Sequence, residues 1–473
     1  MPNKIETGIR GLDDILRGGL PLGSASVLEG APGTGKTTLG MQFLVEGVVQ
    51  HGEAGLYISF EEFPDQIYAN MLEFGWDISE MERTGKMRVL CIEPEIMLEQ
   101  MMTPGGLFEQ VVREINCKRL VIDSISLIRT LGNDAEARNY IYTIRNITRK
   151  LSLTALFIRE YNALDSDNQG FENYVCDGTI RLAFQEGVQA YRKRTLEVLK
   201  MRGTSVMEGQ HVYKILDSGL HVLPSYSSGT NSLTARSSSL STGIETLDRI
   251  LDGGYPESSS FLIDSSSEAS YMYLIAATLA ERIIAGDSIL FTLSSATTLR
   301  QLASKIGLFG VSLEEAMGRG QAYFLDYRNQ KIDPRYEHAR IQMGNLQDHQ
   351  YQEKFGKWRT EVYEEYRKQN KRWFVYFEMN TAISVRTEEF VQGDFVDRLS
   401  QFRNEGTTVL VHCNFKEISP EAASFLQRSC DGVISTWLDN GYHYLQVTKS
   451  PGGRLLPPYI IENVEDKPYI HLV

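Results

Sequence analysis

Residues 30–37 have the composition and spacing of a phosphate-binding loop. Their sequence is Gly-Ala-Pro-Gly-Thr-Gly-Lys-Thr, and its glycines allow the backbone to curl so that successive N–H groups face one anion. In such a loop Lys36 reaches the terminal phosphates of a nucleotide, and the Thr37 hydroxyl binds Mg²⁺. A glycine-rich turn with a chance lysine is the alternative. It is disfavoured because an apolar run, residues 25–29, precedes the loop and a helical stretch, residues 38–44, follows it.

Three carboxylates follow apolar runs of the first half. Glu61 and Glu62 come after residues 55–59, at the carboxyl end of an expected strand, where α/β sheets bind ligands. One of them can act as a general base, and the other can orient it or a water on Mg²⁺. Two solvated glutamates in a turn are the alternative. Asp123 ends the apolar run 119–122 and is expected to hold Mg²⁺ through water.

Two cations, Lys200 and Arg202, lie two residues apart in a run with strand character. On a strand their side chains would project from one face. Such a pair could clamp the γ-phosphate of a nucleotide held by a neighbouring subunit. A solvent-exposed basic strand explains the same spacing, and the sequence does not separate the two interpretations.

The order of apolar and amphipathic runs predicts how these residues are positioned. Apolar runs alternate with longer amphipathic stretches, as in a doubly wound α/β sheet. Helical spacing of isoleucines is found at residues 139–151. The expected strands are residues 27–29, 55–59, 87–91, 119–122 and 154–158, followed by an antiparallel pair at 194–200 and 212–215.

The chain contains an internal repeat. Residues 7–21 recur as residues 242–256, at an offset of 235 positions. The same offset places Tyr271 opposite Lys36 and a serine-rich segment opposite the loop glycines. We therefore expect a tandem duplication with an active domain at 1–224, a Ser-, Thr- and Gly-rich linker at 225–241, and a degenerate domain without a phosphate loop at 242–473.

The second half keeps the scaffold signals but not the full set of chemical groups. Buried strands are expected at residues 288–293, 321–325, 373–377 and 408–412. Glu378 keeps a carboxylate where Asp123 stands, but residues 294–296 contain none where the Glu61 and Glu62 pair lies. We therefore expect no catalysis in this half.

Residues 326–372 have no counterpart of equal length in the first half. They are rich in tyrosine, glutamine and charged residues, and residues 354–371 could form a long polar helix. A solvated excursion is one interpretation, and a surface that binds an unknown protein partner is the other.

Composition bounds the class of protein. The 473 residues, 42% hydrophobic and 23% charged, are enough for two globular domains. The formal net charge of −13 counts against a nucleic-acid binder, because such proteins need a basic face. We also find no apolar segment suited to a signal peptide or a membrane span, so we expect a cytoplasmic protein that does not bind a membrane.

Together these motifs resemble the KaiC group of RecA-superfamily ATPases. The resemblance is carried by the entry motif at 7–19, by the segments 60–62 and 74–77, and by residues 195–205 and 217–220. It is dense in the first half and rests mainly on the entry motif and layout in the second. It implies an α/β fold of two tandem RecA-like (P-loop NTPase) domains, each a mostly parallel twisted sheet flanked by helices. It also implies a homohexameric ring with ATP between subunits.

The resemblance also assigns roles to residues. It implies that ATP phosphates and Mg²⁺ are held by Gly33, Thr34, Gly35, Lys36, Thr37 and Thr38, and that Glu61 and Glu62 are the catalytic pair. It implies that ATP is contacted from the adjacent subunit by Lys200, Met201, Arg202, Thr204, Leu216 and Asp217.

From these observations we expect a slow ATPase whose nucleotide state controls assembly or partner signalling. A nucleotide-gated regulatory or scaffold protein with incidental hydrolysis is the alternative. A serine/threonine autokinase or a DNA-recombination ATPase is less well supported. The second half lacks a phosphate loop, residues 383–387 contain no adjacent Ser-Thr pair, and the charge balance opposes DNA binding.

Overall fold

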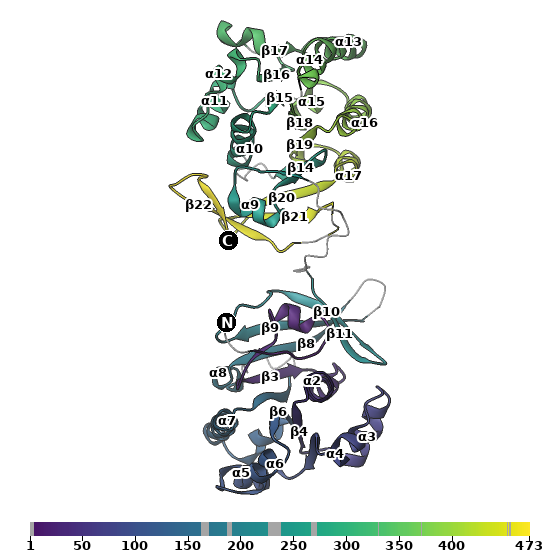
Figure 1. Cartoon of the computed structure of the whole chain (residues 1–473), viewed down its shortest axis with the longest axis vertical. Coiled ribbons are helices and arrows are strands. Elements are labelled where there is room, and N and C mark those ends of the chain that lie inside the picture. Colours follow the sequence, from purple (N-terminus) through teal and green to yellow (C-terminus); the bar gives the residue numbers. More distant parts are fainter. Residues whose placement is uncertain are drawn as a thin grey trace. The chain divides into compact units, whose positions relative to one another are not determined.

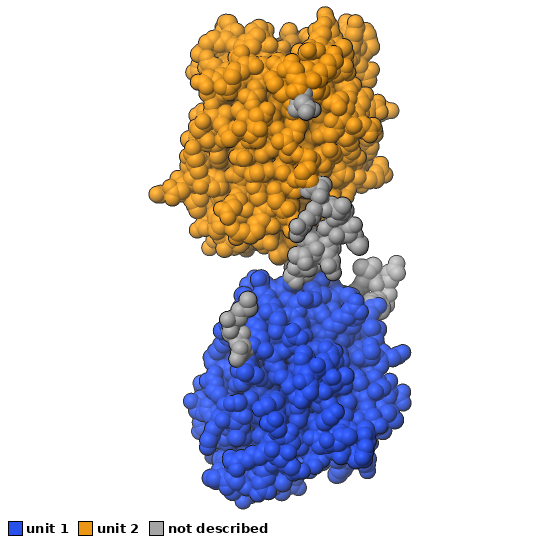
Figure 2. All heavy atoms as spheres, viewed as in Figure 1, with its two compact units in different colours: residues 1–228 blue, residues 229–473 orange. Residues whose placement is uncertain are grey.

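The computed structural model describes residues 4–161, 170–186, 192–225, 238–265, 272–329, 331–369, 371–451, 453 and 456–473. The chain divides into two compact units, Met1–Ser228 (unit 1) and Gly229–Val473 (unit 2), coloured separately in Figure 2. Most of the predicted linker, residues 226–237, lies outside the described residues. The same is true of residues 266–271, which include Tyr271 and the rest of the segment expected to replace the loop in unit 2.

Unit 1 contains all the strands that the apolar runs predict. Its strands are β1 (Lys4–Ile5), β2 (Leu20–Pro21), β3 (Ala25–Gly30), β4 (Ala54–Ser59), β5 (Met87–Cys91), β6 (Cys117–Asp123), β7 (Thr154–Glu160), β8 (Gly178–Glu186), β9 (Arg192–Met201), β10 (Gln210–Leu216) and β11 (Gly219–Leu223). Its helices are α1 (Leu12–Ile15), α2 (Lys36–His51), α3 (Pro64–Leu72), α4 (Ile78–Arg83), α5 (Pro94–Met102), α6 (Leu107–Glu114), α7 (Asp134–Lys150) and α8 (Glu172–Val175).

The main sheet of unit 1 has the order β11-β10-β9-β8-β3-β7-β6-β4-β5. The run from β8 to β5 is parallel, and β9, β10 and β11 extend it in antiparallel fashion. Helices cover both faces, with α2, α3 and α4 on one side and α5, α6 and α7 on the other (Figure 1). Because β3 lies inside the sheet and pairs with β7 and β8, the loop that follows it starts from a fixed, fully buried strand.

Unit 2 repeats this layout. Its strands are β12 (Ser239–Leu240), β13 (Tyr255–Pro256), β14 (Ser260–Ser265), β15 (Ser288–Thr292), β16 (Ala322–Asp326), β17 (Arg340–Gln342), β18 (Trp373–Glu378), β19 (Thr408–Cys413), β20 (Gly432–Asp439), β21 (Tyr442–Lys449), β22 (Tyr459–Asn463) and β23 (Ile470–Leu472). Its helices are α9 (Glu245–Ile250), α10 (Met272–Ile284), α11 (Leu299–Leu308), α12 (Leu313–Gly318), α13 (Asp348–Trp358), α14 (Glu364–Lys368), α15 (Met379–Val385), α16 (Glu388–Asn404) and α17 (Pro420–Ser429).

The two main sheets have matching strand orders. In unit 2 the order is β17-β16-β15-β18-β19-β14-β20-β21-β22-β23, so β14 takes the place of β3 and β18 the place of β6. The strand β17 extends the far edge beyond β16. Helices again lie on both faces, α10, α11 and α12 on one side and α15, α16 and α17 on the other (Figure 1). The fold is thus two tandem RecA-like domains.

The repeated entry motif has a structural role in both units. Asp13 accepts hydrogen bonds from the Thr7 amide (2.7 Å) and hydroxyl (2.8 Å). Asp248 makes the same two contacts with Thr242, each at 2.7 Å. The motif therefore fixes the chain where it enters each sheet, which explains its similarity in the two halves.

The tyrosine-rich segment of unit 2 differs from the expectation of a solvated excursion. It forms one continuous helical stretch, in which a π-helical turn at Arg359–Tyr363 joins α13 to α14. Its aromatic side chains Tyr351, Phe355, Trp358 and Tyr363 are buried in the core of unit 2. The segment is therefore polar on one side only, because its aromatic residues recur at helical spacing and cover the sheet.

Candidate nucleotide site

The loop between β3 and α2 has the backbone shape that an anion cradle requires. Gly33 and Gly35 have φ values of 79° and 91°, in the left-handed region that favours glycine. A Cβ on Gly33 would meet nothing within 4 Å, so the backbone is open on that side. The 16-residue helix α2 begins at Lys36, and its first amides and dipole face the loop. These features fit the phosphates of a nucleotide.

Lys36 and Thr34 anchor this loop from within. The Lys36 ammonium donates to the Ala31 carbonyl at 3.2 Å, and the Thr34 hydroxyl donates to the same oxygen at 2.7 Å. Burial lowers the pKa of Lys36, while the charges of Glu160, Asp123 and Glu61 oppose that shift. The lysine thus stands in a carboxylate-rich site and is the cation nearest to where phosphates would lie.

Asp123 is held by two hydroxyl groups. Thr37 Oγ1 and the Tyr57 hydroxyl each donate to Asp123 Oδ2 at 2.7 Å. Burial raises the pKa of Asp123, and the two hydrogen bonds and the charge of Lys36 oppose this shift. A threonine hydroxyl beside a carboxylate is the hard oxygen donor set that suits Mg²⁺ together with phosphate and water. The predicted Thr37 and Asp123 are therefore brought together.

Glu61 and Glu62 follow β4 on the same edge of the sheet. Their amides donate to Ser59 Oγ at 3.3 and 2.9 Å, which fixes the turn that carries them. Glu61 is exposed and Glu62 half-buried. Burial raises the pKa of Glu62, and the charges of Asp123 and Glu61 add to that shift. A raised pKa makes the Glu62 carboxylate a stronger base, which suits a proton acceptor.

Two residues of this site did not emerge from the sequence. Glu160 ends β7 in register with Gly30, and its charge acts on both Lys36 and Asp123. Its position after the apolar run 154–158 is the signal that could have indicated it. Tyr57 lies within an apolar strand, and nothing in its neighbours distinguishes it from a core tyrosine. Thr38, which was predicted, lies half-buried in the first turn of α2.

The predicted basic pair lies at the opposite edge of the sheet. The Lys200 ammonium donates to the carbonyls of Asn173 (2.7 Å) and Cys176 (2.9 Å), and Arg202 Nη2 donates to the Tyr174 carbonyl (3.1 Å). Because β9 runs antiparallel to β8, its carboxyl end lies at the amino end of β3. Lys200 and Arg202 therefore do not join the phosphate loop of their own chain.

The other four residues predicted to contact ATP lie partly at the amino edge of the sheet and partly at its carboxyl edge. Met201 is buried, with its sulfur 3.9 Å from Ser26 Oγ, and Thr204 donates to the Ser205 carbonyl at 3.1 Å. Both accompany the basic pair. Leu216 instead ends β10 and Asp217 begins the turn that follows it. This turn is close to the loop of the same chain, because Ile215 Cδ1 would lie 2.8 Å from a Cβ on Gly35.

Unit 2 carries a different polar cluster at the edge that corresponds to the loop edge. Ser265 Oγ and His412 Nε2 lie 2.7 Å apart, and His412 Nδ1 lies 3.7 Å from Glu378 Oε1. Glu378 Oε2 accepts a hydrogen bond from the Thr381 amide at 2.9 Å. All four side chains are buried. The cluster ties the ends of the strands to one another and leaves its carboxylate engaged with protein groups.

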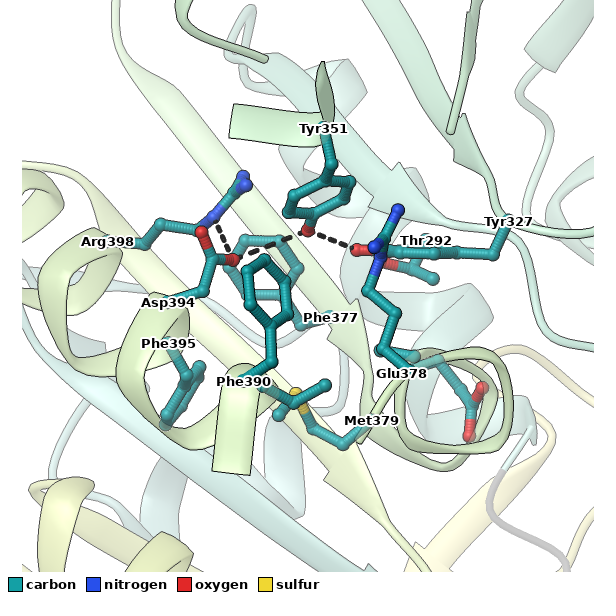
Figure 3. A pocket seen from close by; sticks show the side chains of 13 residues that line it. Thr292, Tyr327, Tyr351, Phe377, Glu378, Met379, Phe390, Asp394, Phe395 and Arg398 are labelled. Carbon is teal, nitrogen blue, oxygen red and sulfur yellow. Dashed lines mark hydrogen bonds and ion pairs between the residues drawn. The ribbon is translucent and has the colours of Figure 1, made fainter. Parts of the chain in front are cut away.

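Glu378 also lines a small aromatic pocket of unit 2 (Figure 3). There the Tyr351 and Tyr327 hydroxyls lie 2.8 Å apart, and Tyr351 also donates to Asp394 at 3.3 Å. Arg398 Nε donates to the same carboxylate at 2.6 Å. The two tyrosines, Asp394 and Arg398 are thus linked to one another, and the pocket has no glycine-rich loop or lysine among its described lining residues, so it does not reproduce the loop site of unit 1.

Comparison with known proteins agrees with the geometry. A family model described as "ATPase: KaiC" matches residues 5–227. The circadian clock oscillator protein KaiC of Acaryochloris marina is 31% identical over 332 residues, which are 67% of this chain and 62% of that protein. The Picosynechococcus protein of the same name is 32% identical over 332 residues, with 67% and 63% covered. The Synechococcus elongatus protein is 32% identical over 288 residues, with 58% and 54% covered.

The fold and the loop define a P-loop NTPase with two RecA-like domains. With these matches, the chain belongs to the KaiC-like ATPases of the RecA superfamily. It spans about three fifths of the length of the curated relatives that it matches. In the described part of the chain, no helix has both the length and the apolar character needed to cross a bilayer.

Proposed function

We propose that unit 1 binds ATP with Mg²⁺ and hydrolyses it slowly, and that the bound nucleotide controls assembly into a ring and contact with a partner. This proposal rests on the hydrogen bond from Thr37 Oγ1 to Asp123 Oδ2, 2.7 Å long, beside a glycine-rich loop. Helix dipole, ammonium and hydroxyl groups there converge on one place, which suits a nucleoside triphosphate.

We assign separate roles in hydrolysis to the residues at the loop edge of the sheet. Backbone amides of residues 33–38 and Lys36 hold the phosphates, and Thr37 and Asp123 hold the metal. Bound Mg²⁺ would neutralise charge that develops on the phosphates. Glu62 accepts the proton of the attacking water, since its pKa is raised, and Glu61 orients that water. We place Leu216 and Asp217 next to the nucleotide of their own chain, because they lie on the loop side.

The placement of the basic pair supports the proposed ring. Lys200 and Arg202 lie at the amino edge of the sheet and the loop at the carboxyl edge. Contact between unlike edges of two copies is heterologous, and such contacts form a ring when the rotation between copies closes. In this arrangement Lys200, Met201, Arg202 and Thr204 face the nucleotide of the adjacent subunit, and the stoichiometry of six is taken from the family.

For unit 2 we propose a scaffold and docking role without catalysis. Its polar cluster engages Glu378 with protein groups, and the residues that replace the loop lack lysine and glycine. The polar side of α13 and α14, within residues 326–372, is the surface that we propose for a protein partner. We propose no kinase activity.

The test is Lys36→Ala beside the control Lys86→Ala, which removes an exposed lysine away from the loop. We expect Lys36→Ala to lose both phosphate release and ATP-dependent assembly, and the control to keep both. Phosphate release that persists in Lys36→Ala would refute the site assignment.

The double variant Glu61→Gln/Glu62→Gln separates hydrolysis from gating. It should bind ATP and lose phosphate release. If it still assembles and still engages its partner with ATP, the protein is a nucleotide-gated regulator in which hydrolysis serves only to reset the state.

A further inference from the structure

An arginine-lined cleft opens at the amino edge of the unit 1 sheet. It has a volume of about 400 Å³ and is bounded by the loop 21–24 and by Arg145, Arg149, Asp177 and Arg202. Arg145 and Arg149 come from the last turns of α7, while Arg202 follows β9. We call it the amino-edge cleft. Neither α7 arginine belongs to a motif that the sequence singled out.

The charge of the cleft is strongly positive for an acidic protein. Three guanidinium groups face a single carboxylate, that of Asp177. Lys200 lies close by, and burial together with the charges of Arg202 and Arg145 lowers its pKa. An uncompensated group of arginines costs free energy unless an anion joins it.

Asp177 holds one of these arginines in a fixed orientation. Arg145 Nη2 donates to Asp177 Oδ1 at 2.8 Å, and Asp177 Oδ2 accepts from the Ala25 amide at 3.2 Å. Burial alone would raise the pKa of Asp177, but these bonds and the charges of Arg145 and Arg149 outweigh it and lower the pKa. The carboxylate thus offsets one of the three guanidinium charges, and the lining of the cleft stays positive overall.

Arg145 retains donors for a ligand. Its side chain lines the cleft and is 12% exposed, and the one hydrogen bond that its guanidinium donates among the described residues comes from Nη2. A guanidinium presents five N–H donors in a planar fork that matches the oxygens of a phosphate. Arg149, 60% exposed, lies 3.8 Å from Asp177 and can turn toward the same anion.

The phosphates cannot come from the loop of the same chain. Six-residue β3 separates the cleft at its amino end from the loop at its carboxyl end, a span of about 17 Å. A second copy placed head to tail would instead bring its own loop edge against the cleft, since the two features lie on opposite edges of one sheet.

We propose that the amino-edge cleft receives the phosphates bound at the loop of a neighbouring copy, with Arg145 and Arg149 as binding residues beside Arg202. Asp177 is a positioning residue that sets the plane of the Arg145 guanidinium. This inference rests on the proposed function and adds two arginines to the intersubunit contact. Guanidinium groups at such a contact stabilise charge on the phosphates and also make assembly depend on nucleotide.

The first test uses full-length Arg149→Gln and the double variant Arg145→Gln/Asp177→Asn, which removes both partners of the buried pair together. The control is Arg113→Gln, whose exposed arginine pairs with Glu109 on α6. We expect ATP-dependent assembly to weaken at least about ten-fold in both cleft variants. Binding of a fluorescent ATP analogue to the unassembled protein should stay unchanged, since the loop is intact.

The second test asks whether the cleft acts between copies. Lys36→Ala, with an intact cleft, is mixed with Arg145→Gln/Arg149→Gln, which has an intact loop. In a random equal mixture at most about one quarter of the contacts between copies pair an intact loop with an intact cleft, so phosphate release should rise above that of either variant alone, to no more than about one quarter of the wild-type rate.

The outcomes separate this inference from the proposed function. Cleft variants that assemble and release phosphate like the wild type would overturn the inference and leave the loop site standing. If the mixture releases no more phosphate than either variant alone, the cleft does not act on the nucleotide of a neighbouring copy, and the inference is refuted. If Lys36→Ala releases phosphate normally, the proposed function fails, and the assembly of the cleft variants still decides the inference. Cleft variants that lose only the binding of free inorganic phosphate would show an anion site unrelated to assembly, which also overturns it.

Discussion

The loop edge of unit 1 and the corresponding edge of unit 2 share a scaffold and differ in chemistry. Register places Glu378 of β18 where Asp123 of β6 stands. Val121, two residues before Asp123, is in register with Tyr57 of β4. Tyr376, two residues before Glu378, is in register with Phe291 of β15. The hydroxyl that orients Asp123 is therefore missing beside Glu378, which is held by the Thr381 amide instead.

A second pair of positions differs just as clearly. Glu29 in β3 lies opposite Arg159 and also pairs with Arg181 at 2.6 Å, whereas Asp264 in β14 lies opposite Cys413. Burial raises the pKa of Asp264, opposed by the Phe415 amide. Apolar strands thus keep the same fold in both units, while a few polar positions at the strand ends differ between them.

The largest expected effect comes from removing the Glu29 charge. Glu29→Gln would leave Arg159 and Arg181 short of a partner in the buried network, at a cost of about 3–5 kcal/mol in the free energy of unfolding of unit 1. Unfolding can be followed by the fluorescence of Trp76, the one tryptophan of the four that lies in unit 1. An unchanged unfolding midpoint would show that this network does not stabilise the strand carrying the loop.

A matched pair of carboxylate variants tests the chemical difference. Asp123→Asn should lower phosphate release about 10- to 100-fold, because the proposed Mg²⁺ would lose the carboxylate that holds it through water. Glu378→Gln, at the same register position, should leave release within about two-fold of the wild type. Equal losses in the two variants would contradict the assignment of catalysis to unit 1 alone.

Tyr57→Phe places in unit 1 the residue type that Phe291 provides at the corresponding position of unit 2. It removes one hydrogen bond that opposes the raised pKa of Asp123, so that pKa should rise further and Mg²⁺ should bind less tightly. We expect up to about a ten-fold higher Mg²⁺ concentration for half-maximal phosphate release. In the pH profile of phosphate release, the acidic limb should move to higher pH. Tyr68→Phe, whose hydroxyl donates to Glu82 away from the loop, is the control. An unmoved Mg²⁺ requirement would remove Tyr57 from the site.

Asp264→Asn should give the smallest change: the free energy of unfolding of unit 2 should rise by no more than about 1 kcal/mol at neutral pH. The folded pKa of Asp264 is raised, so its ionisation costs stability above that pKa, and the cost disappears as pH falls and the group takes up a proton. The gain should therefore vanish in acid. Fluorescence of Trp358, Trp373 and Trp437 reports this unit, and a gain that persists in acid would mean that charge is not its cause.

The sequence predicts the scaffold and part of the site for physical reasons. Buried parallel strands require long apolar runs, so residues 119–122 and 154–158 indicate their strands, and the loop requires its glycines and lysine at fixed spacing. Tyr57 and Arg145 could not be predicted, because their roles depend on register between strands and on a helix packing against a distant turn. The same holds for the buried aromatic side of residues 348–368, where polar residues dominate the composition.

The most direct test of nucleotide-controlled assembly is the mass of this chain in solution with ATP, with ADP and without nucleotide, recorded together with phosphate release. We expect a ring-sized species that needs ATP, slow phosphate release, and loss of both in Lys36→Ala. A monomer in every condition would contradict the role of Lys200 and Arg202 between subunits, and with it the claim that nucleotide at the unit 1 loop controls assembly.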